Sequence, residues 1–263
     1  MKANLRFVYL LLKMKLSRMM VYRLSFFGVT FADGSLFVIH LLTFMIIYGN
    51  IGSIGGWSRG QMIVFVGTFS IINALNMLIY FFGVNGIPQK IRTGDLDQYI
   101  TKPVNPLLRL TFESINPGSF PLVILSVMIV AYGASVGGIA VSFSLAARYA
   151  ALVLLMTLLW YDMEIIIRTI PFFVISVDGI TQLEGHMLEL NFKVPGVLFR
   201  GAFRIFFYYV APYGIMATVP TQYLTGAASA QTLAHAVCVV AAFTAFTLWF
   251  WKFGLRHYKS ASS

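Results

Sequence analysis

The stretch QMIVFVGTFSIINALNMLIYFFGVN, residues 61–85, decides the fold class of this chain. It contains no charged residue, and its few polar side chains are all neutral. An α-helix rises 1.5 Å per residue, so about 20 apolar residues cross the roughly 30 Å hydrocarbon core of a bilayer. We therefore expect residues 61–85 to form a transmembrane helix.

The composition of the whole chain agrees with this expectation. Of its 263 residues, 59% are hydrophobic and only 11% are charged, whereas soluble domains carry about 25% charged residues. The single cysteine, Cys238, excludes a disulfide framework within one chain. The sequence thus predicts an all-α integral membrane protein that forms one domain over residues 1–263.

Five further segments are long and apolar enough to cross a membrane, which gives six transmembrane helices in all. The fourth and fifth of the six are interrupted by Asp162, Glu164 and Arg168, and a single long bent helix is the alternative there. The five segments are residues 25–50, 110–133, 146–161, 165–183 and 231–252.

The distribution of charge predicts the orientation of the chain. Its 19 Lys and Arg residues fall in clusters separated by apolar runs, so they do not form the continuous face that binds nucleic acid. Cytoplasmic loops of membrane proteins are rich in Lys and Arg. Cytoplasmic N- and C-termini place fourteen of the 19 inside and leave five outside, namely Arg59, Arg148, Lys193, Arg200 and Arg204. We expect a multi-pass protein of the inner or plasma membrane in this orientation.

Residues 1–23 combine basic and apolar side chains at roughly helical spacing, without the cleavage pattern of a signal peptide. They are interpreted as an amphipathic helix on the membrane surface, where basic groups meet lipid headgroups. The alternative is a simple positively charged flank of the first span.

The segment 86–109 is too polar to enter the membrane and contains residues that start and stop helices. Pro88 suits the first turn of a short helix, Gly94 can end it in the left-handed conformation, and Asp95 can cap a second short helix. Charged and apolar side chains alternate in this second part, a mixture that fits the groove of a partner protein. The alternative is an ordered loop without a partner.

The segment 193–226 is hydrophobic, but Pro195, Pro212 and Pro220 divide it into pieces too short to span. We expect a re-entrant pair of helices on the outer side. Arg200 and Arg204 are four residues apart, so they are expected on one helix face, where they meet lipid headgroups or an acidic substrate. The alternative is a helix face that is simply in water.

Isolated charges in the apolar regions suggest further roles. Asp33 lies within the first span, where an ionised carboxylate must face the bundle interior, pair with a cation or take up a proton. It is a candidate proton-relay group, or it lies at a bend near Gly34 that water reaches. Glu164 and Arg168 are expected to pair within one helix at a cytoplasmic helix end, and Glu113 is expected to contact the 86–109 loop or Arg109.

Several kinds of chemistry are not indicated. The sequence has no His, Cys or carboxylate pattern with metal-ligand spacing, no G-x-S-x-G motif and no phosphate-binding loop. The chain is thus not expected to be an enzyme by itself or to bind a cofactor. Energy for transport must come from a partner or from an ion gradient.

The order of these features resembles an ABC-2-type transporter permease, the membrane subunit of an ABC exporter, in the subgroup often found as paired permeases. The resemblance covers nearly the whole chain, and its motifs comprise Gly94, Leu96, Asp97 and Pro103, followed by Pro195, Gly196, Leu198, Pro212, Pro220 and Gly226. It implies that 1–23 is an elbow helix, that 86–109 is a cytoplasmic coupling loop and that 193–226 holds outer re-entrant helices.

The resemblance also implies partners. Two ABC ATPase subunits, which hold ATP and Mg, would dock on two permeases, and the second permease would be identical or paralogous. The docking residues implied in this chain are Ile91, Gly94, Asp95, Leu96, Asp97, Tyr99 and Ile100. The substrate would be hydrophobic or amphipathic, such as a lipid, drug or peptide. The alternatives are an ion- or proton-coupled secondary transporter using Asp33 and a membrane scaffold that transports nothing.

Overall fold

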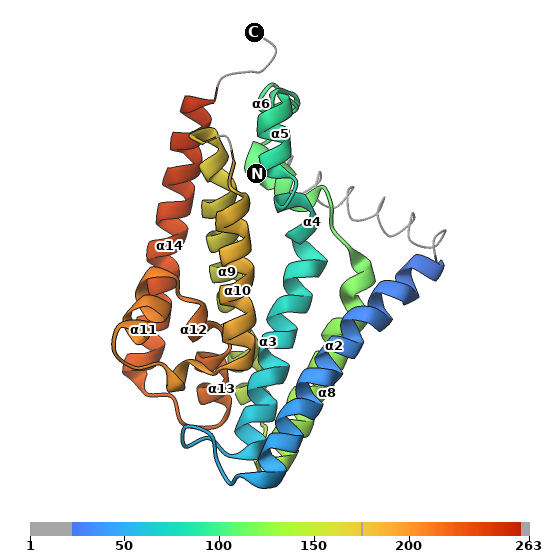
Figure 1. Cartoon of the computed structure of the whole chain (residues 1–263), viewed down its shortest axis with the longest axis vertical. Coiled ribbons are helices and arrows are strands. Elements are labelled where there is room, and N and C mark those ends of the chain that lie inside the picture. Colours follow the sequence, from blue (N-terminus) through green and yellow to red (C-terminus); the bar gives the residue numbers. More distant parts are fainter. Residues whose placement is uncertain (1–22, 175, 259–263) are drawn as a thin grey trace.

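The computed structural model describes residues 23–174 and 176–258, and this part of the chain is built from helices connected by short loops (Figure 1). The predicted amphipathic helix over 1–23 lies outside the described residues apart from Arg23. The long helices are α2 (Arg23–Asn50), α3 (Arg59–Ile79), α8 (Phe120–Val136), α9 (Phe143–Thr169), α10 (Asp178–Lys193) and α14 (Ala230–His257).

Short helices gather at the two ends of this bundle (Figure 1). One end holds α4 (Phe81–Val84), α5 (Ile87–Thr93), α6 (Asp97–Ile100) and α7 (Pro106–Phe112), called the α4–α7 segment below. The other end holds η3 (Gly196–Leu198), α11 (Gly201–Ile205), η4 (Phe206–Val210), α12 (Tyr213–Met216) and α13 (Thr218–Leu224). The short helices η1 (Pro117–Ser119) and η2 (Ile170–Phe172) adjoin α8 and α9.

Serine caps fix where three of the long helices begin. Ser58 accepts a hydrogen bond from the Gln61 backbone while the Gln61 side chain accepts one from the Ser58 backbone, which starts α3. Ser142 and Ser229 cap α9 and α14 in a similar way. A serine oxygen satisfies a backbone N–H that has no partner in the first helical turn. All three starts lie at the end opposite the α4–α7 segment (Figure 1).

Five helices of the described chain are long and apolar enough to cross a membrane. They correspond to α2, α3, η1 with α8, α9 with η2, and α14, so the expectation of an all-α membrane fold is confirmed. A bent pair, Gly201–Val210 with Tyr213–Leu224, turns by 80° and would be a sixth candidate only if it were counted as one span. Both α10 and α14 meet this pair at the same end of the bundle (Figure 1).

The predicted boundaries of the third, fourth and fifth spans were wrong. The third starts at Pro117 and not at 110, because α7 ends at Phe112 and the chain turns before η1. The fourth is one continuous helix from Phe143 to Thr169, without an end at 161. The chain then turns and returns as α10, which runs beside α9 to the opposite end of the bundle (Figure 1).

Proline breaks the segment 193–226 at only two of the three expected places. Pro195 precedes η3, and Pro212 precedes α12. Pro220 lies inside α13, whose first residue is Thr218. Proline is tolerated in the first turn of a helix because the backbone N–H groups there have no intrahelical partner.

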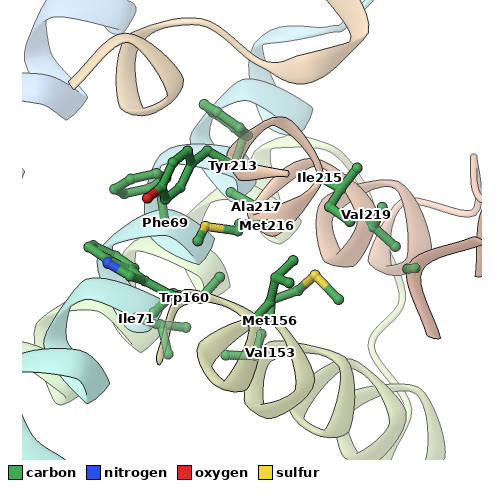
Figure 2. Packing of buried hydrophobic residues seen from close by; sticks show 14 of the residues in the cluster. Phe69, Ile71, Val153, Met156, Trp160, Tyr213, Ile215, Met216, Ala217 and Val219 are labelled. Carbon is green, nitrogen blue, oxygen red and sulfur yellow. The ribbon is translucent and has the colours of Figure 1, made fainter. Parts of the chain in front are cut away.

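The main core lies where α3, α9, α12 and α13 meet (Figure 2). Figure 2 shows Met156 of α9 and Met216 of α12 between Phe69 of α3 and Val219 of α13. Met156 and Met216 are fully buried. Helices α12 and α13 thus share one packed core with two long helices and are not a loosely attached loop.

Glycines allow α3 and α8 to approach at backbone distance. A Cβ added at Gly67 would lie 2.8 Å from the Val130 backbone nitrogen, and one at Gly133 would lie 2.7 Å from the Val64 nitrogen. Gly60 and Gly137 meet in the same way. The small-residue spacing at Gly133 and Gly137 marks a true helix contact, as such motifs do in membrane proteins.

We expect Gly67→Ala to lower the free energy of unfolding by about 1–3 kcal/mol, the usual cost of overpacking, because the new methyl group meets backbone atoms of α8. Unfolding in lipid bicelles by added SDS, followed by tryptophan fluorescence, measures this. Gly49→Ala on α2 is the control, since no atom lies within 4 Å of the added Cβ. Equal effects of the two substitutions would contradict the close packing of α3 and α8.

Candidate functional site

Local sequence signals shape the α4–α7 segment. Pro88 lies in the first turn of α5, and Gly94 ends that helix with a φ of 80°, as predicted. The Leu96 N–H closes the turn by donating to the Lys90 carbonyl at 3.1 Å. Asp95 does not cap α6, in contrast to the prediction, because its carboxylate accepts a hydrogen bond from the Thr93 hydroxyl at 2.6 Å.

The segment has a hydrophobic core of its own. Leu96 is fully buried, and Ile91 and Tyr99 are nearly so. They pack with Tyr80 at the end of α3, Ile165 of α9 and Trp251 of α14, together with Val84, Ile87, Leu107 and Leu110. This cluster attaches the α4–α7 segment to three of the long helices.

A polar network stiffens the same segment. The Tyr99 hydroxyl donates to Glu113 at 2.6 Å, and Lys90 pairs with Glu113 at 2.7 Å. Arg109 lies 4.2 Å above the Tyr99 ring centroid and donates to the Gln98 carbonyl. Burial and the bond to Glu113 raise the pKa of Tyr99 well above its ordinary value, so it stays neutral. The predicted contact of Glu113 with the 86–109 loop is confirmed.

The structure divides the seven residues proposed for docking into two groups. Ile91, Leu96 and Tyr99 face inward and hold the segment together. Asp95 is exposed, Ile100 is 43% exposed, and Gly94 and Asp97 are partly exposed. A partner can therefore touch the second group, while the first group determines its shape.

A second site lies inside the bundle, between α2, α3, α9 and α10. Asn76 of α3 donates to Glu164 of α9 at 2.9 Å, and Arg168 of α9 pairs with Glu184 of α10 at 2.8 Å. All four side chains are buried. A cavity of about 470 Å³ adjoins them and also reaches Asp33 of α2.

The helical repeat explains why Asp162, Glu164 and Arg168 do not end α9. Successive residues are about 100° apart, so Glu164 and Arg168 share a face and Asp162 lies almost opposite. Asp162 accepts a hydrogen bond from Thr244 of α14, on the far side of α9 from the cavity. The predicted intrahelical pair of Glu164 with Arg168 was wrong, because each residue bonds to a different neighbouring helix.

Asp33 faces the interior of the bundle, as one of the predicted alternatives required. It is partly exposed and lines the cavity, and the adjacent Gly34 is buried against Leu122 and Leu125 of α8. Asn76 and Glu184 were not predicted as site residues. The signal that could have revealed them is a polar side chain on an otherwise apolar face, placed within two turns of a helix end.

Arg200 and Arg204 do not share a helix face, in contrast to the prediction. Arg200 precedes α11 in extended backbone, whereas Arg204 lies within that helix. Both side chains are exposed, and the Arg204 guanidinium lies 5.5 Å from the centroid of the Tyr208 ring. No group of three or more metal-ligating side chains occurs among the residues that the structure describes.

We expect Arg168→Ala to lower the free energy of unfolding by about 3–5 kcal/mol, because the substitution leaves the Glu184 carboxylate buried without its cation. The measurement is again SDS unfolding in bicelles. Lys193→Ala is the control, since it breaks an exposed pair with Glu189 that contributes about 0.2–0.5 kcal/mol. A loss at Arg168 no larger than that of the control would show that the buried pair does not hold α9 to α10.

Comparison with known proteins agrees with this architecture. The sequence matches the family model described as ABC-2 family transporter protein over residues 35–262, the greater part of the chain. No curated protein and no solved structure gives a significant match. Together with the apolar helices, the family match shows that the chain belongs to the ABC-2 family of transporters, as a multi-pass membrane component that is not itself the ATPase.

Proposed function

We propose that this chain is the permease subunit of an ATP-driven exporter that moves a hydrophobic or amphipathic substrate out of the cytoplasm. Two ATPase subunits, which carry ATP and Mg, would dock on two permeases, and the second permease would be a copy of this chain or a paralogue. Membership of the ABC-2 family supports the ATP-driven class over an ion-coupled transporter.

One observation carries this proposal: the exposed tip of the α4–α7 segment stands on a core shared with the long helices. Asp95 and Ile100 are exposed at the tip, and Leu96 beneath them is fully buried. The core includes Ile165 of α9 and Trp251 of α14. A displacement applied to the tip is therefore transmitted to helices that cross the membrane, which is what coupling to a separate ATPase requires.

Charge supports an orientation with the α4–α7 segment in the cytoplasm. Arg59 and Arg148 lie at or near the start of α3 and α9, and Lys193 ends α10. With Arg200 and Arg204 they remain at the end opposite the α4–α7 segment after the spans are corrected (Figure 1). Eight other basic residues lie in the part of the chain that the structure describes, and this orientation assigns them to the cytoplasmic side, as the positive-inside rule expects. They are Arg23, Lys90, Arg92, Lys102, Arg109, Arg168, Lys252 and Arg256.

The combined substitution Asp95→Lys and Ile100→Glu is expected to reduce co-purification of the ATPase at least tenfold, because it reverses the charge and removes the apolar side chain at the tip. The measurement is the amount of ATPase retained on the tagged permease. Glu189→Lys, a charge reversal of an exposed residue on α10, is the control and should retain the ATPase. Normal ATPase retention by the tip variant would contradict docking at this segment.

The orientation is tested by thiol labelling in intact cells, after Cys238→Ser removes the single cysteine. An impermeant maleimide is expected to label Ala227→Cys, in the loop before α14, and to leave Gln98→Cys unlabelled until the cells are opened. Both positions are exposed. Labelling of Gln98→Cys in sealed cells would place the α4–α7 segment outside and exclude ATPase docking there.

A further inference from the structure

We propose that the cavity between α2, α3, α9 and α10 binds a protonated primary amine, and that this ammonium group is the recognised part of the exported substrate. That the bound amine is an exported substrate rests on the proposed exporter function. The binding site itself is argued from the residues of this chain alone. Its essential residues are Asp33, Asn76, Glu164 and Glu184.

Unmatched hydrogen-bond acceptors are the first reason. Glu164 is only 2% exposed and Asn76 only 1%. Oε1 of Glu164 accepts from the Asn76 amide, but Oε2 of Glu164 and Oδ1 of Asn76 have no hydrogen-bond partner. Leaving such a group unpaired in a buried site is unfavourable, and more so for a charged group. A ligand that donates several hydrogen bonds would remove this cost.

Glu184 adds a third unmatched acceptor. Its Oε2 pairs with Arg168, whereas its Oε1 has no hydrogen-bond partner. The Trp160 indole lies close enough to Glu164, and the Tyr213 hydroxyl close enough to Glu184, to stabilise each acid electrostatically. Neither donor makes a hydrogen bond of normal geometry in the structure, so both stay unpaired beside the free oxygens. The site therefore presents three buried oxygens without a donor.

The balance of charge gives the sign of the ligand. The described residues that line the cavity include three acids, Asp33, Glu164 and Glu184, and one base, Arg168. When ionised, the three acids exceed the one base, so an anion is repelled and a cation supplies the charge that a neutral alcohol lacks. A buried charge is tolerated only when it is paired, so a cation is the complementary ligand.

The remainder of the lining is suited to an apolar body attached to that cation. Trp160, Phe81, Met77 and Leu188 contribute apolar surface to the cavity. Aromatic faces attract cations, and apolar walls remove hydrocarbon from water. A volume of about 470 Å³ falls within the range of small-molecule sites. An amphipathic amine fits these features together.

The cavity lies near the end of the bundle that carries the α4–α7 segment, and this location suits binding of a ligand that arrives from that end. Asn76 and Glu164 lie within two turns of the ends of α3 and α9 that face the α4–α7 segment, and Glu184 lies within two turns of the start of α10. The ammonium group could arrive on a free amphipathic amine or on the headgroup of a phosphatidylethanolamine lipid. Both carry the same primary ammonium.

The test measures binding of radiolabelled 4-phenylbutylamine to the full-length chain in phosphatidylcholine nanodiscs at neutral pH, without ATPase or nucleotide. We expect saturable binding that weakens at least tenfold in Glu164→Gln and in Asp33→Asn. Each amide matches the size of the side chain that it replaces. At position 164, the glutamine oxygen can still accept the hydrogen bond from Asn76. Glu189→Gln, on the exposed side of α10, is the matched control and should bind like the unaltered chain.

Two further comparisons make the result specific. The alcohol 4-phenylbutanol should compete at least tenfold more weakly than the amine, because it carries no positive charge. Adding phosphatidylethanolamine to the nanodiscs separates the two sources of the ammonium. Competition by this lipid that disappears in Glu164→Gln identifies a lipid headgroup as the ligand, and its absence identifies a free amine.

Equal saturable binding by the unaltered chain and by both acid variants, or equal competition by the alcohol, would overturn the proposal. Melting temperatures of the variants show whether they are folded. Because no ATPase is present, loss of ATPase docking in the tip variant leaves this assay unaffected. Failure of amine binding with intact ATPase docking would overturn this inference and leave the proposed exporter function standing.

Discussion

The cost of burying charge in an apolar bundle is the constraint on which this structure depends. Three charged side chains lie in the last eight residues of α9, and all three are buried. Each meets a different neighbour: Asp162 meets α14, Glu164 meets α3 and Arg168 meets α10. Breaking one such contact leaves a buried charge unpaired, so these helices are held around α9 in one register.

The same end of α9 lies against both the α4–α7 segment and the cavity. Ile165 is fully buried in the core of the α4–α7 segment, and the preceding residue, Glu164, lines the cavity. On α3, Asn76 lies one turn before Tyr80, which belongs to the same core. Neighbouring residues of both α3 and α9 thus belong to the core of the α4–α7 segment and to the lining of the cavity.

Much of the fold could be predicted from hydropathy. The extents of α2 and α14 follow from apolar runs, and the turn at Gly94 follows from the freedom of glycine to adopt a positive φ. Hydropathy failed where a polar residue can either mark the end of a helix or be buried in contact with another helix. Asp162, Glu164 and Arg168 were interpreted as a helix end, because a sequence does not show which charges will find partners on distant helices.

The two parts of the candidate site differ in how far they could be predicted. The α4–α7 segment is built from contacts close in sequence, such as Tyr99 with Glu113, and its outline could be predicted. The cavity joins Asp33 with Glu184, which are far apart in the chain. Only the packing of α10 beside α9 brings them together. Helix α10 was not predicted, because its polar side chains do not give the apolar run from which the other long helices were recognised.

That shortness has a mechanical consequence for the surrounding membrane. The 16 residues of α10 rise about 24 Å, several ångströms less than the usual thickness of a hydrocarbon core. The side chains of Ile180 and Leu183, in its first two turns, are exposed on the surface of the protein. Where lipid contacts this helix, the bilayer must become thinner or water must reach the polar ends of the helix. Hydrophobic mismatch of this kind costs a modest free energy per ångström.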